Sequence, residues 1–110
     1  MKSSQKKNLV LIQLNELNFN LVKHYVNDDH LNNFKKIIAE GIVETFSEKK
    51  YELLEPWIQW VSVNTGKSAN EHGVFRLGDI ASSQHKQIYE ILEENGNKVG
   101  AVAPMNTKNN

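Results

Sequence analysis

The stretch EPWIQWVSVNTGKSANEHGVFRLG, Glu55–Gly78, decides how the rest of the chain is interpreted. Pro56 fixes its own φ and lacks an N–H, so it suits the first turn of a helix, and Glu55 then stands at the helix N-terminus. Gly66 can take the positive φ that ends a helix. Three- and four-residue spacings place four residues on one face of this helix: Trp57, Trp60, Val61 and Asn64. The stretch therefore predicts a buried helix with a carboxylate at the end that favours anions.

Composition limits the classes of function. The 110 residues suit one domain or part of one, and 13 basic residues balance 13 acidic ones, so no global field attracts nucleic acid or anionic lipid. Cysteine is absent, which excludes disulfides and thiolate metal sites. The longest strongly apolar run, Leu9–Leu14, is too short to span a membrane. We therefore expect a cytoplasmic protein with no membrane span and no nucleic-acid partner.

Three apolar segments are predicted as strands. Residues 8–14 (NLVLIQL) are apolar on both faces apart from Gln13, as in a buried parallel strand. Residues 42–46 alternate apolar and polar, and residues 99–103 are small and apolar. Helices are predicted over the four ranges 19–26 with Asn18 as cap, 31–40, 56–65, and 84–95 with Ser83 as cap.

This order of elements predicts an α/β fold, a parallel sheet with helices on both faces. Residues 1–7 are predicted to be a disordered N-terminus. Because an open parallel sheet needs further strands and helices to cover it, residues 8–110 are interpreted as the N-terminal part of a single larger α/β domain. In such sheets ligands bind at the carboxyl ends of strands, where Asn15 and Glu16 follow the first strand.

Four features in this order resemble the N-terminal third of the alkaline phosphatase superfamily, particularly its type I phosphodiesterase and sulfatase branches. They are an apolar strand ending in polar residues, the run LNNFKKIIAEG at 31–41, a helix closing with Thr65-Gly66, and His72-Gly73-Val74. The run from EPWIQW to LGD looks like a less characterised branch found among bacterial surface-polysaccharide proteins. The resemblance implies an alkaline-phosphatase-like domain, with zinc, manganese or magnesium as cofactor.

The departures from the family pattern bear on chemistry. Asn15, with Glu16 next to it, stands where the family has its first metal-binding Asp; an Asn carbonyl ligates a hard cation without adding charge. Counting back from Thr65-Gly66, the nucleophile position falls on Glu55 or Pro56. Glu55 is therefore a candidate metal ligand, general base or carboxylate nucleophile, but not the family's hydroxyl or formylglycine.

Each candidate residue also has an ordinary structural interpretation. Glu55 could be only a helix-end charge, and Asn15 and Glu16 only a strand-end turn. Trp57 could belong to the core or stack on a substrate ring. Arg76 could be solvated or contact a phosphate or sulfate. His72, a lone histidine before glycine, is interpreted as a structural turn residue.

Two functions follow from these residues. The first is the N-terminal portion of a metal-dependent phosphoester or sulfoester hydrolase or transferase, acting on small-molecule, glycan or lipid-linked substrates and completed by the C-terminal part of the domain. On this interpretation Asn15, Glu16 and Glu55 contact metal, Glu55 is catalytic, and Trp57 and Arg76 bind substrate. The alternative is a non-catalytic module that binds a glycan or a partner protein, as the substitutions at Asn15 and Glu55 would suggest.

Overall fold

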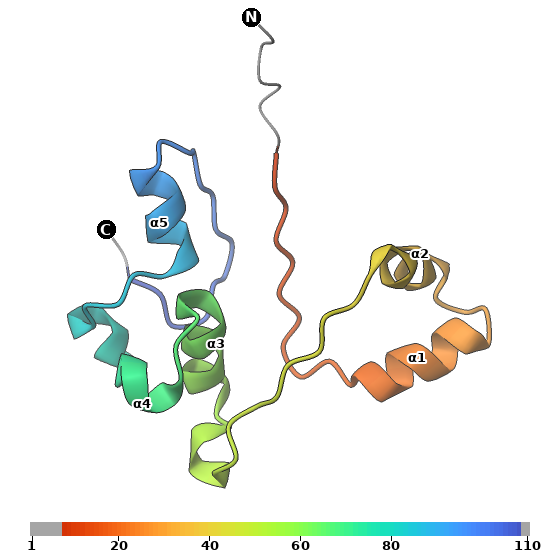
Figure 1. Ribbon diagram of the computed structural model, residues 1–110, viewed down its shortest axis with the longest axis horizontal. Helices are drawn as coiled ribbons and strands as arrows, with labels where there is room; N and C mark the ends of the chain where they lie inside the picture. Colours follow the sequence, from red (N-terminus) through yellow and green to blue (C-terminus); the bar gives the residue numbers. More distant parts are fainter. Residues whose placement is uncertain (1–7, 109–110) are drawn as a thin grey trace, which may run out of the picture. The chain divides into compact units, whose positions relative to one another are not determined.

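The computed structural model describes residues 8–108, and it divides the chain into two compact units, Met1–Glu44 and Thr45–Asn110. Both units are helical in their described parts (Figure 1). The predicted disordered N-terminus, residues 1–7, lies outside the described residues. Whether the two units belong to one larger domain stays a prediction. None of the helices between residues 8 and 108 combines the length and the apolar character needed to cross a membrane.

The predicted parallel-sheet α/β fold is wrong for this structure, because residues 8–108 contain no strand and no sheet. The three predicted strands, 8–14, 42–46 and 99–103, lack regular secondary structure. An apolar run favours an extended backbone locally, but a strand also requires a neighbour to accept and donate its hydrogen bonds. That second condition depends on residues distant in sequence, and the pattern of a single segment does not contain it.

Unit 1 is a pair of helices, α1 (Phe19–Asn27) and α2 (Asn32–Glu40), that pack against each other. The Asn18 side chain caps α1 by accepting hydrogen bonds from the backbone N–H groups of Asn20 and Leu21 at 3.0 and 3.2 Å. This confirms the predicted helix and its cap. Within the described part of the unit, Val22 and Val26, four residues apart on α1, are the buried side chains.

Unit 2 is organised around α3 (Pro56–Thr65), which begins and ends where the sequence predicts. Glu55 is its N-cap residue, and Gly66 ends it in the left-handed conformation at φ 66°. Its buried face differs in part from the prediction. Val61 and Asn64 are buried as expected, Ile58 joins them, and the two tryptophans are only half-buried.

Two small apolar clusters pack on α3. One contains Leu53 from the short 3-10 helix η1 (Tyr51–Leu53), with Ile58 and Ala69. The other joins Val61 to Val74 and Ile80, the latter from η2 (Asp79–Ser82). Residues that are up to 19 positions apart in the sequence, such as Val61 and Ile80, thus pack together on α3, a helix of 10 residues. The core of unit 2 is therefore centred on this helix.

The remaining helices of unit 2 are short. α4 (Ala69–His72) occupies a stretch that the sequence predicts as a loop and a turn. α5 (Ile88–Glu94) begins four residues later than predicted, with Gln87 rather than Ser83 at its N-cap. Ser83 instead accepts a hydrogen bond from the His85 N–H at 3.2 Å, a local turn that keeps residues 83–85 out of the helix.

Candidate functional site

Glu55 lies at the position that the sequence indicates, immediately before the first turn of α3. Its backbone carbonyl accepts from the N–H groups of Ile58 and Gln59, both at 2.9 Å, so its main chain is fixed by the helix. Its side chain is exposed and makes no capping hydrogen bond. The carboxylate therefore remains accessible at the positive end of the helix dipole, although a catalytic role for it stays a prediction.

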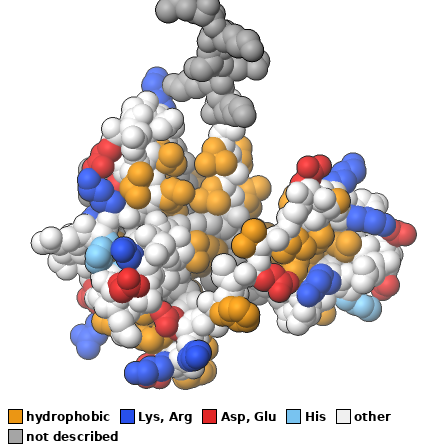
Figure 2. Space-filling model, viewed as in Figure 1, with side chains coloured by type: hydrophobic (Ala, Val, Ile, Leu, Met, Phe, Trp, Pro, Cys, Tyr) orange, Lys and Arg blue, Asp and Glu red, His pale blue; other side chains and the backbone are white. Residues whose placement is uncertain are grey.

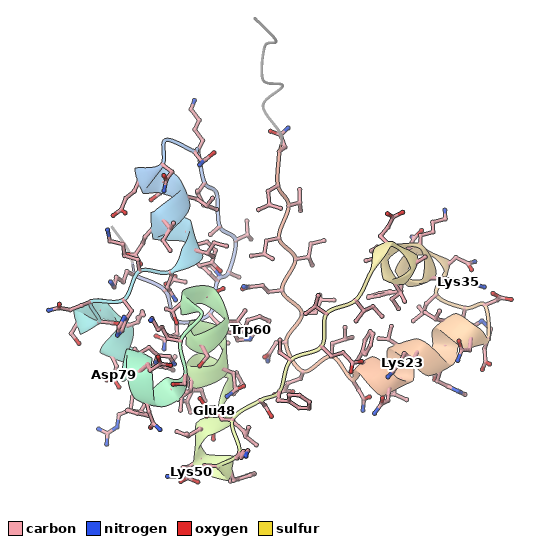
Figure 3. All side chains as sticks on the ribbon, viewed as in Figure 1. Lys23, Lys35, Glu48, Lys50, Trp60 and Asp79 are labelled. Carbon is pink, nitrogen blue, oxygen red and sulfur yellow. The ribbon has the colours of Figure 1, made fainter. Side chains whose placement is uncertain are left out.

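Trp57 and Arg76, the two predicted substrate-binding residues, meet through one loop. The Trp57 indole N–H donates to the Phe75 carbonyl oxygen at 3.2 Å, and its ring packs against the Leu53 cluster. Arg76 is exposed, and its backbone N–H donates to the Asp79 carboxylate at 2.9 Å. Figure 3 labels Asp79 beside α4. Trp57 is thus engaged in holding the loop, and the Arg76 side chain projects from a loop whose backbone is fixed.

Asn15 and Glu16 belong to the other unit, where they form a turn before α1. Glu16 is exposed and adopts a left-handed conformation at φ 55°, which is uncommon for a residue with a side chain. Asn15 and Glu16 lie in unit 1, whereas Glu55 lies in unit 2. Their convergence on one metal ion stays a prediction.

A pair that the sequence did not single out, Ser62 and His72, lies in the interior of unit 2. The Ser62 hydroxyl oxygen is 2.9 Å from His72 Nε2. On the other side of the ring, Nδ1 accepts a hydrogen bond from the Val74 N–H at 3.0 Å. Because Nδ1 accepts, the proton of the neutral ring is on Nε2, and the ring donates to Ser62.

This tautomer decides what the pair can do. A histidine that activates a serine must accept the hydroxyl proton, whereas here His72 Nε2 already carries one. The geometry resembles that of a nucleophile and its base, but the direction of the hydrogen bond is opposite. Ser62 and His72 therefore join α3 to α4 structurally.

Acidic side chains organise the start of α4. Glu71 accepts from the Ser68 hydroxyl and N–H at 2.6 and 2.9 Å, and these hydrogen bonds lower the pKa of its carboxyl group. The Glu48 carboxylate accepts from the Ala69 N–H at 2.8 Å, and Figure 3 labels it close to α3 and α4. The Ser-x-x-Glu spacing of 68–71 is a recognisable sequence signal, but the contact of Glu48 across 21 residues is not.

Asn106 ties the C-terminal segment to the first turn of α3. Its side-chain N–H donates to the Trp57 carbonyl at 2.9 Å, and its own carbonyl accepts from the buried Gln87 side chain at 3.2 Å. It adopts a positive φ of 51°, which Asn tolerates better than most residues. No sequence pattern indicated Asn106, because its role depends on contacts 49 residues apart.

Zinc, manganese or magnesium would need a cluster of donors. In the part of the chain that the structure describes, residues 8–108, no group of three or more His, Asp or Glu side chains lies close enough to hold a metal ion. The three implied ligands supply two carboxylates and one neutral amide, divided between the two units. Metal binding by this chain therefore stays a prediction.

The chain was compared with known proteins at three levels. No protein-family profile, no curated protein and no solved structure matches it. The resemblance to the alkaline phosphatase superfamily accordingly rests on the motifs between residues 8 and 103, and it stays a prediction.

Proposed function

We propose that this chain is an interaction module whose exposed apolar segments bind a further polypeptide segment, from a separate protein or from another part of the same domain. The observation that supports the proposal is the exposure of residues 9–14 and 42–46. Val10 and Ile12 are 78% and 73% exposed, and Val43 is 90% exposed. Figure 2 shows apolar side chains on the surface along the segment that follows the grey terminus. Contiguous exposed apolar surface in a folded protein marks an interaction site.

The energetics favour a covered state for these segments. Complete burial of one Leu, Ile or Val side chain contributes about 1.5–3 kcal/mol. Residues 9–12 form an uninterrupted run of four such side chains, all of them exposed. Four burials together contribute about 6–12 kcal/mol, whereas ordering the four backbone residues costs about 4–8 kcal/mol. The backbone N–H and C=O groups that are covered also need hydrogen-bond partners. A polypeptide strand supplies both apolar cover and hydrogen bonds.

The same reasoning favours a polypeptide over a glycan as the bound species. Leu9, Val10, Leu11 and Ile12 have no hydrogen-bonding groups in their side chains, whereas sugars are held by polar and aromatic side chains. The resemblance suggests the C-terminal part of the domain as the covering polypeptide, and a separate partner protein is the other source of the same chemistry.

Site-specific photocrosslinking in the cells that make the protein tests the proposal. A benzophenone amino acid at Ile12 is expected to give a covalent adduct to polypeptide, either another chain or a distant part of this one. The matched control is the same group at Asn33, an exposed polar position on α2 in the same unit. Equal labelling at the two positions, or adducts that contain only carbohydrate, would contradict the proposal.

A second candidate is the hydrolase or transferase of phosphate or sulfate esters, and Glu55 is the observation that favours it. Its exposed carboxylate stands at a helix N-terminus. Glu55 is also one of the two positions, Glu55 or Pro56, on which the nucleophile of the resembled family is expected to fall. A divalent cation, when bound, polarises the ester oxygen. Glu55 would then act as metal ligand, general base or nucleophile, with substrate contacts from Arg76 and the Trp57 ring.

Metal-dependent stability separates this candidate from the first. Melting temperature is measured with added zinc, manganese and magnesium for the wild type, Glu55→Gln and the control Glu52→Gln, an exposed carboxylate three residues earlier. A hydrolase predicts a rise in wild type and control that Glu55→Gln lacks, because a ligand that binds only the folded state stabilises it. It also predicts cleavage of an aryl phosphate, phosphodiester or sulfate by the longest natural form. Neither effect in any form would exclude this candidate.

A further inference from the structure

His72 is a buried histidine with both ring nitrogens in use. The residue is only 4% exposed, and it connects α4 to the segment that follows. Nδ1 accepts from the Val74 N–H, and Nε2 donates to Ser62 on α3. Only a neutral ring can accept at one nitrogen while donating at the other. The observed contacts therefore require His72 to be uncharged.

The hydrogen bond from the Val74 N–H to His72 fixes the start of residues 73–78. Val74 is buried in the cluster with Val61 and Ile80, so it anchors residues 73–78 on the helix. The rest of that segment is attached through backbone groups, since Phe75 accepts from the Trp57 indole and donates to Asp79 at 3.1 Å. His72 and Asp79 are thus the titratable side chains in this set of contacts, and His72 is the one that accepts from the Val74 N–H.

The titratable groups around the ring are Glu71 on α4 itself and, from other parts of unit 2, Glu48 and His85. Burial lowers the pKa of His72, and the nearby His85 lowers it further. Glu48 and Glu71 act in the opposite direction and raise it, while α3 presents the uncharged Ser62 hydroxyl. Both carboxylates already accept backbone hydrogen bonds at the start of α4, and they are therefore only partly available to a charged ring.

We propose that His72 is an acid-operated latch, which holds residues 73–78 against α3 while neutral and releases them when protonated. When Nδ1 is protonated it can no longer accept a hydrogen bond, so the bond from the Val74 N–H is lost. The two N–H groups, of Val74 and of Nδ1, then face each other. The released segment would detach Val74 from its cluster and Phe75 from the Trp57 indole. The part of the molecule that would move is therefore the loop of residues 73–78, which contains Arg76.

The direction of the pH dependence follows from linkage. The folded protein binds the His72 proton less tightly than the unfolded chain, in which a histidine has a pKa of about 6.5. The stabilisation by the neutral ring is therefore complete above about pH 6.5 and is lost as the pH falls from there toward the lower pKa of the folded state. The latch should open in this window, which mildly acidic compartments reach.

The test follows urea unfolding by tryptophan fluorescence, which reports on unit 2 because Trp57 and Trp60 both lie in α3. Wild type should show a lower urea midpoint at about pH 5.5 than at about pH 7.5. His72→Gln should lose this difference, because the Gln carbonyl can accept from Val74 and does not titrate. His24→Gln, at an exposed histidine of unit 1, should retain the wild-type difference.

The same acid response in His72→Gln as in wild type would overturn the proposal. Should His72→Gln fail to unfold cooperatively at about pH 7.5, the wild-type ring decides the question by NMR. A titration of His72 below the ordinary value, with the Val74 amide shift moving in step, supports the latch. A ring that titrates at its ordinary value, or a Val74 amide that stays unchanged while the ring titrates, refutes it.

Discussion

The two units differ in how their helices are held. In the described part of unit 1, two valines on α1 are buried, and α2 buries none of its side chains. In the described part of unit 2, helices α3 and α4 and the 3-10 turns η1 and η2 contribute to the two buried clusters. The polar residues Asn64, His72 and Gln87 are buried there as well. The comparison shows that two packed helices can form with little buried surface, whereas a core requires several segments that return to the same helix.

The short length of the helices makes each unit dependent on packing between its elements. α1 and α2 have nine residues each, fewer than an isolated helix needs to be stable in water. They therefore depend on packing, and exposed apolar residues such as Leu21 and Ile37 leave much of that packing unused. α3 is hardly longer at ten residues, but it is contacted by residues from both sides in sequence. We expect unit 2 to be the more stable unit.

The largest expected effect comes from the core of unit 2. Val61→Ala removes two methyl groups from a side chain that is fully buried, and should lower the free energy of unfolding of unit 2 by about 2 kcal/mol. Val63→Ala, on the same helix at 64% exposure, should change it by less than about 0.5 kcal/mol. Urea unfolding monitored by tryptophan fluorescence measures both. Similar costs for the two variants would show that α3 is not the centre of a packed core.

A smaller effect is expected at the end of α3. Gly66 has a φ of 66°, and Gly66→Ala should destabilise unit 2 by about 1 kcal/mol because a side chain is strained in this conformation. Gly100→Ala is the control, since Gly100 has an ordinary φ and open space around it. Thermal unfolding by circular dichroism compares them. An unchanged midpoint for Gly66→Ala would mean that α3 ends without the left-handed residue.

The smallest effects concern the helix caps, one in each unit. Asn18→Ala removes the acceptor for two N–H groups of α1, and Ser68→Ala removes the side chain that completes the capping box of α4. Each should cost about 0.5–1 kcal/mol. Amide hydrogen exchange should show faster exchange only in the unit that carries the change. Faster exchange in both units from either variant would show that their stabilities are coupled.

The helices were the most predictable part of the fold. Asn18, Pro56 and Gly66 set a helix start or end through contacts within one turn of their own positions, so neighbouring residues in the sequence are enough to predict them. The parallel sheet was predicted incorrectly because residues 8–14 carry the pattern of a buried strand without determining which segment lies beside them. The late start of α5 has a different, local origin, since Ser83 accepts from the His85 N–H in a turn instead of capping the helix.

The candidate site divides along similar lines. Glu55 was located correctly at the start of α3, because a proline after it fixes the helix start. The engagement of Trp57 with Phe75, and the links from Glu48 to Ala69 and from Asn106 to Trp57, were not predictable. These contacts join residues 18 to 49 positions apart, and no local spacing rule describes them.

The sequence by itself determined where α1 begins and where α3 begins and ends, since dihedral preferences and capping hydrogen bonds act over three or four residues. It also determined the zero net charge, the absence of cysteine and the presence of apolar runs such as residues 9–14, which contain no charged side chain. Only the tertiary structure decided which apolar residues are buried, which tautomer His72 adopts, and that residues 8–14 and 42–46 form no strand. The physical reason is that burial and hydrogen-bond partnership are properties of pairs of distant residues, whereas a helix turn is a property of neighbours.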